Sequence, residues 1–428
     1  MSIKELHKLF TDSTGVSTDS RKIWEGCIYI ALKGDRYNGN EYAHQAIDQG
    51  AKYAIVDEPI SNANSKIIRV ESGLVTLQIL SNYHRKSCGW PVLAITGSNG
   101  KTTSKELIGA VLRSKLNTLI TEGNLNNHIG VPLTLLRGSK EHKVAVIEMG
   151  ASHFGDIDEL CEIADPDIGL ITNIGKAHLE GMGGIEGVIK TKTELFDYIK
   201  SKNGQILLNT NQPLLATYYS ETNACNYGSK HLNDLQGTAR NENGYLIVDW
   251  KLQTDNKSHT IKTNLVGNYN LDNVLSAIAV GIHFGIAPDN IGRAIEEYMP
   301  TNNRSEYVES GNNRIIWDAY NANPSSMSAA IDNIANMNSE RVVLILGEMN
   351  EVGKTSLNEH KTLVELAQSK NPTAIYLVGN AFGSISGVMQ FENVENLETR
   401  LKSEPINDAL ILVKGSRSNQ LEKLRGIL

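Results

Sequence analysis

The sequence predicts an α/β protein of three domains, with a mostly parallel sheet in the central one. Three observations support this prediction. At 428 residues the chain is long enough for about three domains of roughly 150 residues each. From Val92 onward, short apolar runs alternate with helical patterns, which is typical of strands joined by crossover helices. After a junction at Met299–Arg304 the alternation resumes, so we expect domains at residues 1–90, 91–300 and 301–428.

The composition is that of a globular protein. Hydrophobic residues make up 40% of the chain and charged residues 21%. The formal net charge of −7 argues against a nucleic-acid-binding surface. Wide spacing of the cysteines argues against a disulfide framework or a zinc site; they are Cys27, Cys88, Cys161 and Cys225. The N-terminus lacks an apolar signal core and no run approaches ~18 apolar residues, so we expect a cytoplasmic protein without membrane insertion.

A phosphate-binding loop is predicted where the sequence VLAITGSNGKTT leads from an apolar run through a Gly-rich turn into a helical pattern. Gly97 and Gly100 allow backbone N–H groups to turn toward a ligand, and Lys101 adds a positive charge. Thr102 offers a hydroxyl for Mg²⁺. A plain turn between strand and helix would also use the glycines. The combination of strand, turn, Lys, Thr and helix favours nucleotide binding.

Polar residues follow other strands of the predicted central sheet, where ligands gather in parallel sheets. Glu148 ends an apolar run in which an unpaired carboxylate would be costly, so Mg²⁺ ligation is favoured over a strand-end Glu facing water. His178 follows the next strand, and a satisfied loop histidine and a metal contact both stay open. The candidate strands are Val92–Thr96, Val144–Glu148, Ile168–Thr172 and Ile206–Asn209.

Lys192 lies on the apolar face of a predicted helix at Glu186–Lys200. The apolar stripe of that helix consists of Val188, Ile189, Leu195, Phe196 and Ile199. Lys190 points elsewhere and is interpreted as an ordinary solvated lysine. Two interpretations of Lys192 stay open: its stem covers apolar surface with the ammonium in water, or burial lowers its pKa so that it reacts as a neutral amine.

The remaining segments complete the expected architecture. A small N-terminal unit includes a strand-like run at Gly26–Gly34. Antiparallel strands at Gln236–Trp250 and His259–Val266 and a helix at Asn270–Gly285 extend the central domain. The last domain has strands at Arg314–Trp317, Val342–Leu346, Ala374–Val378 and Ala409–Val413 and a helix at Pro324–Ile334 capped by Asn323. It is Rossmann-like but has no Gly-x-Gly-x-x-Gly loop, so a dinucleotide is not implied.

Eight stretches in this order resemble the Mur ligases, most closely the members that add D-alanyl-D-alanine. They are Ser17–Arg21, Thr96–Thr103, Gly123–Pro132, Glu148–Ser152, Ile171–Glu180, Asp318–Pro324, Leu346–Met349 and Val413–Arg417. That family's phosphate loop also lacks the first Walker A glycine, which Ile95 replaces here. The resemblance implies a cytoplasmic, monomeric, ATP-dependent ligase that joins D-alanyl-D-alanine to UDP-N-acetylmuramoyl-tripeptide through an acyl phosphate, in peptidoglycan precursor synthesis.

The resemblance also implies the ATP and metal site. ATP would be held by Gly97, Asn99, Gly100, Lys101, Thr102, Thr103, Asn270, Asn273, Arg304 and Asp318. Two Mg²⁺ ions would be served by Thr102, Glu148, His178 and Lys192. Lys192 matches a lysine that the family carbamylates with CO₂, and Lys101, Glu148, His178 and Lys192 would act in catalysis. Tyr269 departs from the family, which usually has His there.

The substrate contacts follow in the same way. The N-terminal domain would bind UDP through Thr18, Ser20, Arg21 and Lys33. Further contacts to the muramoyl substrate would come from Asn124, Asn126, Asn127 and Ser152. The incoming dipeptide would meet Tyr320, Asn321, Asn323, Lys414, Ser416 and Arg417. The Asn-Ala-Asn-Pro segment is also a good helix cap, and His128 stands where this branch often has an acidic residue.

Three alternatives remain beside this ligase. The first is another amino-acid-adding ligase of the same fold, including the folylpolyglutamate type, against which the first ~90 residues argue. The second is a P-loop phosphotransferase or NTPase switch. The third is a non-catalytic nucleotide-binding scaffold, which Glu148, His178 and Lys192 argue against.

Overall fold

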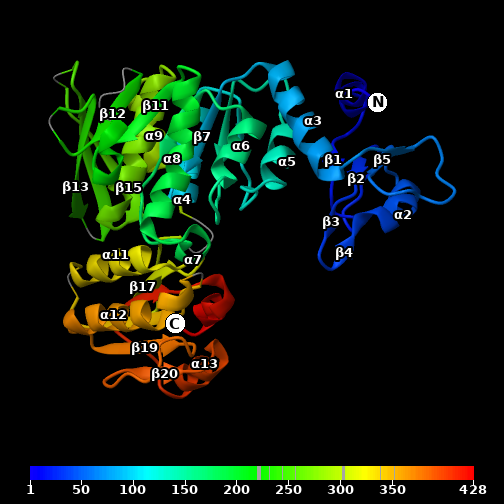
Figure 1. Ribbon diagram of the computed structural model, residues 1–428. Coiled ribbons are helices and arrows are strands. Elements are labelled where there is room, and N and C mark those ends of the chain that lie inside the picture. The colour runs from blue at the N-terminus through cyan, green and yellow to red at the C-terminus, as the bar shows by residue number, and fades with distance from the viewer. Residues whose placement is uncertain are drawn as a thin grey trace.

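The computed structural model describes residues 1–218, 223–230, 232–242, 244–255, 257–300, 304–337, 339–350 and 352–428. Within these residues the chain forms sheets of four, nine and six strands, one in each of three successive parts, and a small two-stranded hairpin. This confirms the predicted α/β class. Figure 1 shows the six-stranded part packed below the nine-stranded part, while the four-stranded part stands to one side. The predicted junction at Met299–Arg304 lies partly outside the described residues.

The N-terminal part is a small parallel sheet with the order β1-β2-β5-β6. Its elements are α1 (Ile3–Thr11), β1 (Val16–Ser17), β2 (Ile28–Ile30), the hairpin β3 (Lys33–Gly34) and β4 (Tyr37–Asn38), α2 (Ala43–Asp48), β5 (Tyr53–Val56) and β6 (Ile67–Arg69). The run Gly26–Gly34 is thus two strands rather than one. The second of these strands pairs with β4, and the Gly39 N–H donates to the Leu32 carbonyl at 2.9 Å at the open end of this hairpin.

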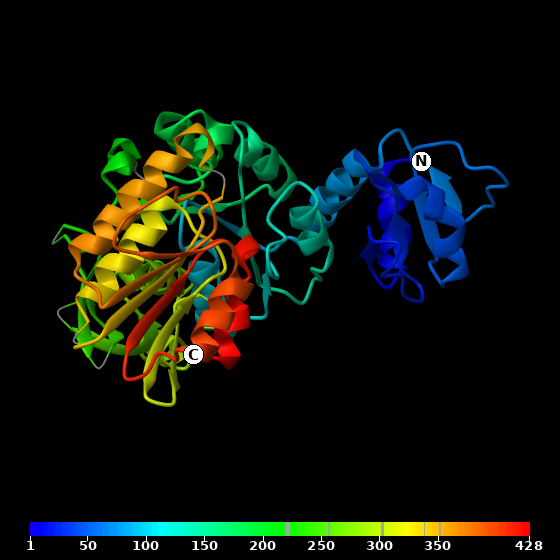
Figure 2. The same ribbon diagram turned by 90° about the horizontal axis from the view of Figure 1, so that it is seen from below.

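Helix α3 (Gly73–Cys88) joins this part to the central sheet, and Gly89 ends it in a left-handed conformation at φ 75°. In Figures 1 and 2 it spans the space between the two parts. Its C-terminal half is fixed to the central domain. The Arg85 guanidinium lies 2.6 Å from an Asp167 carboxylate oxygen, and His84 Nε2 donates to the Gly138 carbonyl at 2.8 Å. The predicted boundary at residue 90 stays a prediction.

The central sheet has the order β15-β14-β13-β12-β11-β10-β7-β9-β8. Its parallel strands are β7 (Val92–Thr96), β8 (Thr118–Ile120), β9 (Val144–Glu148), β10 (Ile168–Ile171), β11 (Gln205–Asn209) and β12 (Ala224–Gly228). Alternate residues of β7 face opposite cores: Leu93 and Ile95 belong to one and Val92 and Ala94 to the other. Burial on both faces explains why these strands are continuous apolar runs.

Helices cover both faces of this sheet. One face packs against α4 (Lys101–Arg113), α9 (Leu271–His283) and α10 (Pro288–Glu296). The other packs against α5 (Gly130–Leu136), α6 (Asp156–Ala164) and α8 (Ile185–Ser201), with the short α7 (Leu179–Met182) before α8. The predicted antiparallel extension is present as β13 (Leu235–Glu242), β14 (Tyr245–Leu252) and β15 (His259–Val266). Within the described residues, no helix is long and apolar enough to cross a bilayer.

The C-terminal sheet has the order β16-β17-β21-β18-β19-β20, parallel except for the β16–β17 pair. Its strands are β16 (Glu306–Ser310), β17 (Asn313–Asp318), β18 (Val342–Gly347), β19 (Ala374–Val378), β20 (Met389–Phe391) and β21 (Leu410–Lys414). Helices α11 (Pro324–Ala335) and α12 (Ser356–Ser369) pack on one face and α13 (Val394–Ser403) on the other. As predicted, Asn323 caps α11, in a capping box with Ser326. Short 3-10 helices occupy Gly39–Tyr42, Pro213–Tyr218, Asn268–Asn270, Gly353–Thr355, Arg417–Asn419 and Leu421–Gly426.

Candidate active site

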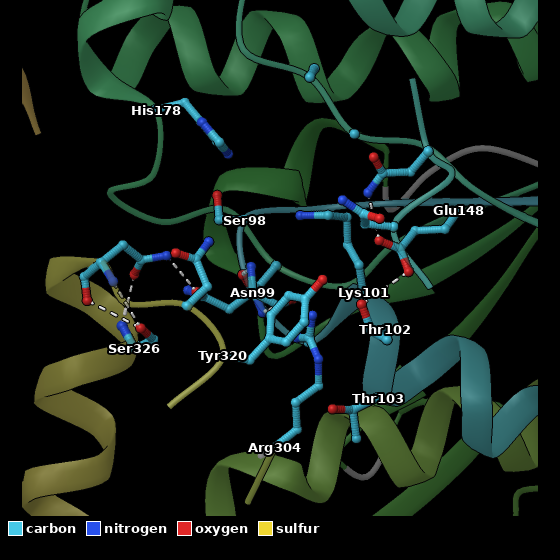
Figure 3. A pocket seen from close by; sticks show the side chains of 18 of the residues that line it. Ser98, Asn99, Lys101, Thr102, Thr103, Glu148, His178, Arg304, Tyr320 and Ser326 are labelled. Atoms are coloured by element: carbon cyan, nitrogen blue, oxygen red, sulfur yellow. Dashed lines mark hydrogen bonds between the residues drawn. The ribbon is translucent and has the colours of Figure 1, made fainter. Parts of the chain in front are cut away.

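A cavity of about 790 Å³ lies where the central and C-terminal domains meet (Figure 3). Its walls come from the β7–α4 loop, the residues after β8, the end of β9, the loop that follows β10 and the start of α9. The C-terminal domain closes it with Arg304, Asp318, Tyr320, Asn321, Asn323 and Lys414. The carboxyl ends of the parallel strands therefore meet at one opening, as expected for an α/β sheet.

The β7–α4 loop has the backbone shape of a phosphate cradle. Gly97 has φ 144°, and a Cβ there would lie 2.0 Å from Thr172 Oγ1. Gly100 has φ 75°, and a Cβ there would lie 2.4 Å from Asn273 Oδ1. Helix α4 starts at Lys101, whose Nζ donates to the Gly97 carbonyl at 2.6 Å. The loop thus places a lysine and a helix N-terminus beside the cavity, which is an anion-binding arrangement.

Residues after β10 hold this loop in place. The Asn99 N–H donates to Asn173 Oδ1 at 2.9 Å, and the Thr172 hydroxyl donates to the Asn99 carbonyl at 2.6 Å. The Ser98 hydroxyl donates to the Gly175 carbonyl at 3.0 Å. Two adjacent strand ends therefore share one hydrogen-bonded network, which fixes the shape of the loop.

Replacing Gly97 by alanine is expected to weaken nucleotide binding at least about tenfold, because positive φ costs an L-residue roughly 1–2 kcal/mol and the new Cβ must displace Thr172. Titration calorimetry with an ATP analogue measures this loss. Gly155→Ala is the matched control, since Gly155 has φ 87° but an open space where a Cβ would lie. Equal loss of nucleotide affinity in both variants would contradict the cradle.

Glu148 is buried at the end of β9 with 2% of its surface exposed. The Thr102 hydroxyl donates to Glu148 Oε2 at 3.0 Å, and Asn126 Nδ2 donates to Glu148 Oε1 at 2.8 Å. These hydrogen bonds reduce the free-energy cost of burying the carboxylate. From the sequence, we expected Mg²⁺ to offset that cost. The hydrogen bonds also place a hydroxyl and a carboxylate oxygen side by side, which are ligands that Mg²⁺ prefers.

Lys192 is buried in α8 with 1% of its surface exposed, so its ammonium does not reach water. Within the described residues, its Nζ has no hydrogen-bond partner. Burial, together with the nearby positive charge of Lys101, lowers the pKa of Lys192 to about 7. Lys190, two positions earlier, is exposed and its Nζ lies 4.3 Å from the centre of the Phe154 ring. Lys192 is therefore held where a neutral, reactive amine is favoured.

His178, Asn270 and Asn273 line the same cavity. His178 precedes α7 and has φ 51°. Figure 3 shows its side chain above Ser98. Asn273 Nδ2 donates to Asn270 Oδ1 at 2.8 Å, and the Ser104 hydroxyl donates to Asn273 Oδ1 at 3.0 Å. The Tyr269 hydroxyl, 2.9 Å from Ser305 Oγ, has a pKa raised by burial.

On the C-terminal side the cations pair with an aromatic ring and a carboxylate. The Arg304 guanidinium lies 3.9 Å from the centre of the Tyr320 ring, and Lys414 Nζ forms an ion pair with Asp318. Asn323 caps α11 through Oδ1 and donates through Nδ2 to Asn99 Oδ1 at 2.7 Å, so it also touches the phosphate loop. Asn323 is therefore both a helix cap and a cavity residue.

Of the other predicted site residues, some lie outside this cavity and some on its wall. Gly97, Lys192, Ser416 and Arg417 are not part of its described lining, although Gly97 shapes the loop and the Arg417 guanidinium lies 5.7 Å from the centre of the Tyr320 ring. Thr18, Ser20, Arg21 and Lys33 belong to the N-terminal part, which stands apart in Figure 2. Asn124, Asn126, Asn127, Ser152 and Thr103 do line the cavity.

Two groups beside the site were missed by the sequence analysis. Lys105 is fully buried near Glu148, and its position four residues after Lys101 on α4 is a signal that helical periodicity offers. The Glu194 carboxylate accepts from the backbone N–H groups of Gly155 and Asp158 at 2.9 and 3.0 Å. Nothing in the local sequence indicates these contacts of Glu194, because they join α8 to the start of α6.

Comparison with known proteins identifies the family. The Mur ligase middle domain matches residues 95–281, the Mur ligase glutamate ligase domain matches residues 303–417, and the Mur ligase family catalytic domain matches residues 12–85. A Bacillus subtilis protein named UDP-N-acetylmuramoyl-tripeptide–D-alanyl-D-alanine ligase is 33% identical over 425 residues, covering 96% of this chain and 92% of that protein. The chain belongs to the Mur ligase family.

Solved structures of Mur ligases have the same fold over nearly the whole chain. MurF from Acinetobacter baumannii matches with a TM-score of 0.87 at 28% identity, covering 98% of this chain and 97% of that one. MurF ligase from Thermotoga maritima in complex with ADP matches with a TM-score of 0.88 at 26% identity, covering 98% and 97%. The three-domain arrangement of this Mur ligase is therefore found in structures of the family.

Proposed function

We propose that this Mur ligase uses ATP to join D-alanyl-D-alanine to UDP-N-acetylmuramoyl-tripeptide, in peptidoglycan precursor synthesis. The observation that supports it best is that the phosphate loop and Glu148 share one cavity with Arg304, Tyr320 and Lys414 of another domain. The full-length relatives with this activity support the same assignment. Because ATP is an intracellular substrate, we expect a cytoplasmic protein, and we expect it to act as a monomer.

The proposed reaction has two steps. A terminal carboxylate oxygen of the tripeptide attacks the γ-phosphorus of ATP, ADP leaves, and an acyl phosphate results. The amine nitrogen of the dipeptide then attacks the acyl carbon, inorganic phosphate leaves, and the nitrogen loses a proton to give the amide. Negative charge moves in both steps, so Lys101 and the N-terminus of α4 would stabilise the transferring phosphoryl group.

The residues present fit Mg²⁺ and a carbamylated lysine. Thr102 and Glu148 offer adjacent oxygens, and His178 offers a ring nitrogen on the cavity wall. Bound Mg²⁺ would neutralise phosphate charge. The buried amine of Lys192, without a hydrogen-bond partner among the described residues, fits reaction with CO₂, which forms an N–C bond, releases a proton and gives a carboxylate-like group. We expect two Mg²⁺ sites, with Lys192 serving them in this form.

The three substrates would be bound by different parts of the chain. Thr18, Ser20, Arg21 and Lys33 would bind UDP, and Asn124, Asn126, Asn127 and Ser152 the muramoyl part. Tyr320, Asn321, Asn323, Lys414, Ser416 and Arg417 would meet the dipeptide, while Asn99, Thr103, Asn270, Asn273, Arg304 and Asp318 would hold ATP. Arg21 and Lys33 now pair with Asp19 and Glu58 at 2.9 and 2.6 Å, so UDP would compete with these carboxylates.

An amine panel tests this function by phosphate release in the presence of ATP, Mg²⁺ and UDP-N-acetylmuramoyl-tripeptide. We expect release with D-alanyl-D-alanine to exceed that with D-alanine, L-alanyl-L-alanine or L-glutamate at least about 100-fold, because a site built to hydrogen-bond one substrate rejects analogues that leave its groups unpaired. Release that needs no amine would instead support a phosphotransferase or NTPase. A preference for L-glutamate would support the folylpolyglutamate type.

A further inference from the structure

Lys105 is a fully buried cation in the second turn of α4, with no exposed side-chain surface. Its Nζ donates to the Thr121 carbonyl at 2.7 Å and lies 3.5 Å from the Gly123 carbonyl oxygen. The same atom lies 3.1 Å from Glu106 Oε1 and 3.9 Å from Glu148 Oε2. Burying an ammonium is costly unless such partners compensate it. An apolar side chain would fill this space at lower cost, which points to a role beyond packing.

The two carbonyls that Lys105 contacts begin the segment that carries the asparagines of the cavity. The Thr121 hydroxyl accepts from the Glu148 N–H at 3.0 Å, so this residue is bound to the end of β9 as well as to Lys105. Further along, Asn126 Nδ2 donates to the Glu148 carboxylate at 2.8 Å, and the Asn126 carbonyl accepts from the Gly150 N–H at 2.8 Å. The segment is therefore held at its start by both Lys105 and β9, and at its middle by the end of β9 again.

Lys105 itself lies outside the described lining of the cavity, whereas Asn124, Asn126 and Asn127 line it. At 3.9 Å from Glu148 Oε2 the ammonium is too far for a hydrogen bond but close enough for an electrostatic attraction. The ammonium therefore influences the cavity only indirectly, through the backbone of residues 121–123 and the Glu148 carboxylate.

We propose that Lys105 is a positioning residue, which fixes the segment 121–127 and the Glu148 carboxylate so that the asparagines meet the UDP-linked substrate. The inference rests on the proposed function for the identity of that substrate. The tether itself is a property of the free protein. Without the ammonium, the Thr121 carbonyl loses its buried donor and the start of the segment is no longer held to α4.

The experiment compares Lys105→Met with the wild type. We expect the KM for UDP-N-acetylmuramoyl-tripeptide to rise about tenfold and kcat to fall about 10- to 100-fold, with the KM for ATP unchanged within about threefold, as for groups that orient site residues. In the free protein, hydrogen exchange is expected to quicken at residues 121–127 and to stay unchanged at α9. A purely structural defect would lower the active fraction and leave every KM unchanged.

Three further variants make the test decisive. Glu106→Gln removes the half-buried ionic partner of Lys105, which lies outside the described lining of the cavity, and is expected to match the wild type. Lys105→Arg keeps the charge and the donors and is expected to restore the KM and the exchange protection at least in part. Lys105→Gln, whose shorter amide cannot reach the Thr121 carbonyl, replaces Lys105→Met if that variant does not fold.

Unchanged exchange at residues 121–127 in a folded Lys105→Met or Lys105→Gln variant would overturn the inference, as would equal defects in Lys105→Met and Glu106→Gln. Failure of the proposed function gives a different result, because the wild type would then show no phosphate release that depends on D-alanyl-D-alanine. The hydrogen-exchange experiment needs no substrate. It therefore tests whether Lys105 holds residues 121–127 whether or not the proposed function is correct.

Discussion

Lys192→Ala is expected to lower kcat for amide formation at least about 10²- to 10³-fold, the loss typical when a group that stabilises transition-state charge is removed. The physical reason is the environment of the amine. It is 1% exposed, and within the described residues it has no hydrogen-bond partner. A carbamate formed there would supply anionic oxygens toward the metal sites, and alanine cannot form one. Phosphate release with all three substrates measures the loss.

Two variants sharpen this test. Lys190→Ala is the matched control, because Lys190 lies on the same helix but is exposed over the Phe154 ring, and we expect wild-type turnover. Lys192→Arg keeps a positive charge but cannot add CO₂, so we expect it to be as inactive as Lys192→Ala. A carbon NMR signal from ¹³C-bicarbonate, present in the wild type and absent in both Lys192 variants, reports the carbamate directly. Full turnover of Lys192→Ala would refute the carbamate.

Glu148→Gln is expected to lower kcat about 100-fold or more while leaving the protein as stable as the wild type. Glutamine has nearly the same shape, its amide oxygen can accept from Asn126, and the rotatable Thr102 hydroxyl can accept from its NH₂. The packing is therefore kept and the negative charge is lost. The activity should fall because the carboxylate, and not the hydrogen bonds, would hold the metal.

Thermal unfolding and magnesium titration separate these effects. The unfolding midpoint of Glu148→Gln should match the wild type, whereas more Mg²⁺ should be needed for half-maximal phosphate release. Glu122→Gln is the control, because Glu122 is 72% exposed and its carboxylate pairs with Arg137 rather than with Thr102. Unaltered magnesium dependence in Glu148→Gln would argue that the carboxylate only braces the Asn126 segment.

The central strands could be predicted from the sequence because both faces of each are buried, which makes them continuous apolar runs. In the central and C-terminal sheets, strands β8, β12, β16 and β20 were not predicted. Three residues of β8 form too short a run to be told from a helix end, and β16 is only partly buried, so its sequence lacks an apolar run. Their strand character depends on neighbours in the sheet that are distant in sequence.

In the candidate site, too, some features could be predicted from the local sequence, whereas others depend on residues that are distant in sequence. Lys101, Thr102 and Glu148 could be placed from the sequence, because each follows or ends a strand of recognisable pattern. The family resemblance assigned Arg21 and Lys33 to UDP. The pair of Arg21 with Asp19 is a local turn pair of the kind that such a sequence suggests, whereas the pair of Lys33 with Glu58 joins residues 25 positions apart, which no local pattern indicates. The contact of Asn323 with Asn99 joins residues 224 positions apart, which no local pattern indicates.

Helix α3 has one more consequence for the substrate. Its 16 residues extend about 24 Å, and contacts from Arg85 and His84 fix its C-terminal half to the central domain. The residues proposed to bind UDP therefore stand at a set distance from the phosphate loop. A spacer of this kind would select substrates by length. If a UDP-linked peptide had too few amino acids, its terminal carboxylate would not reach the γ-phosphate of ATP while its nucleotide was bound by the N-terminal domain.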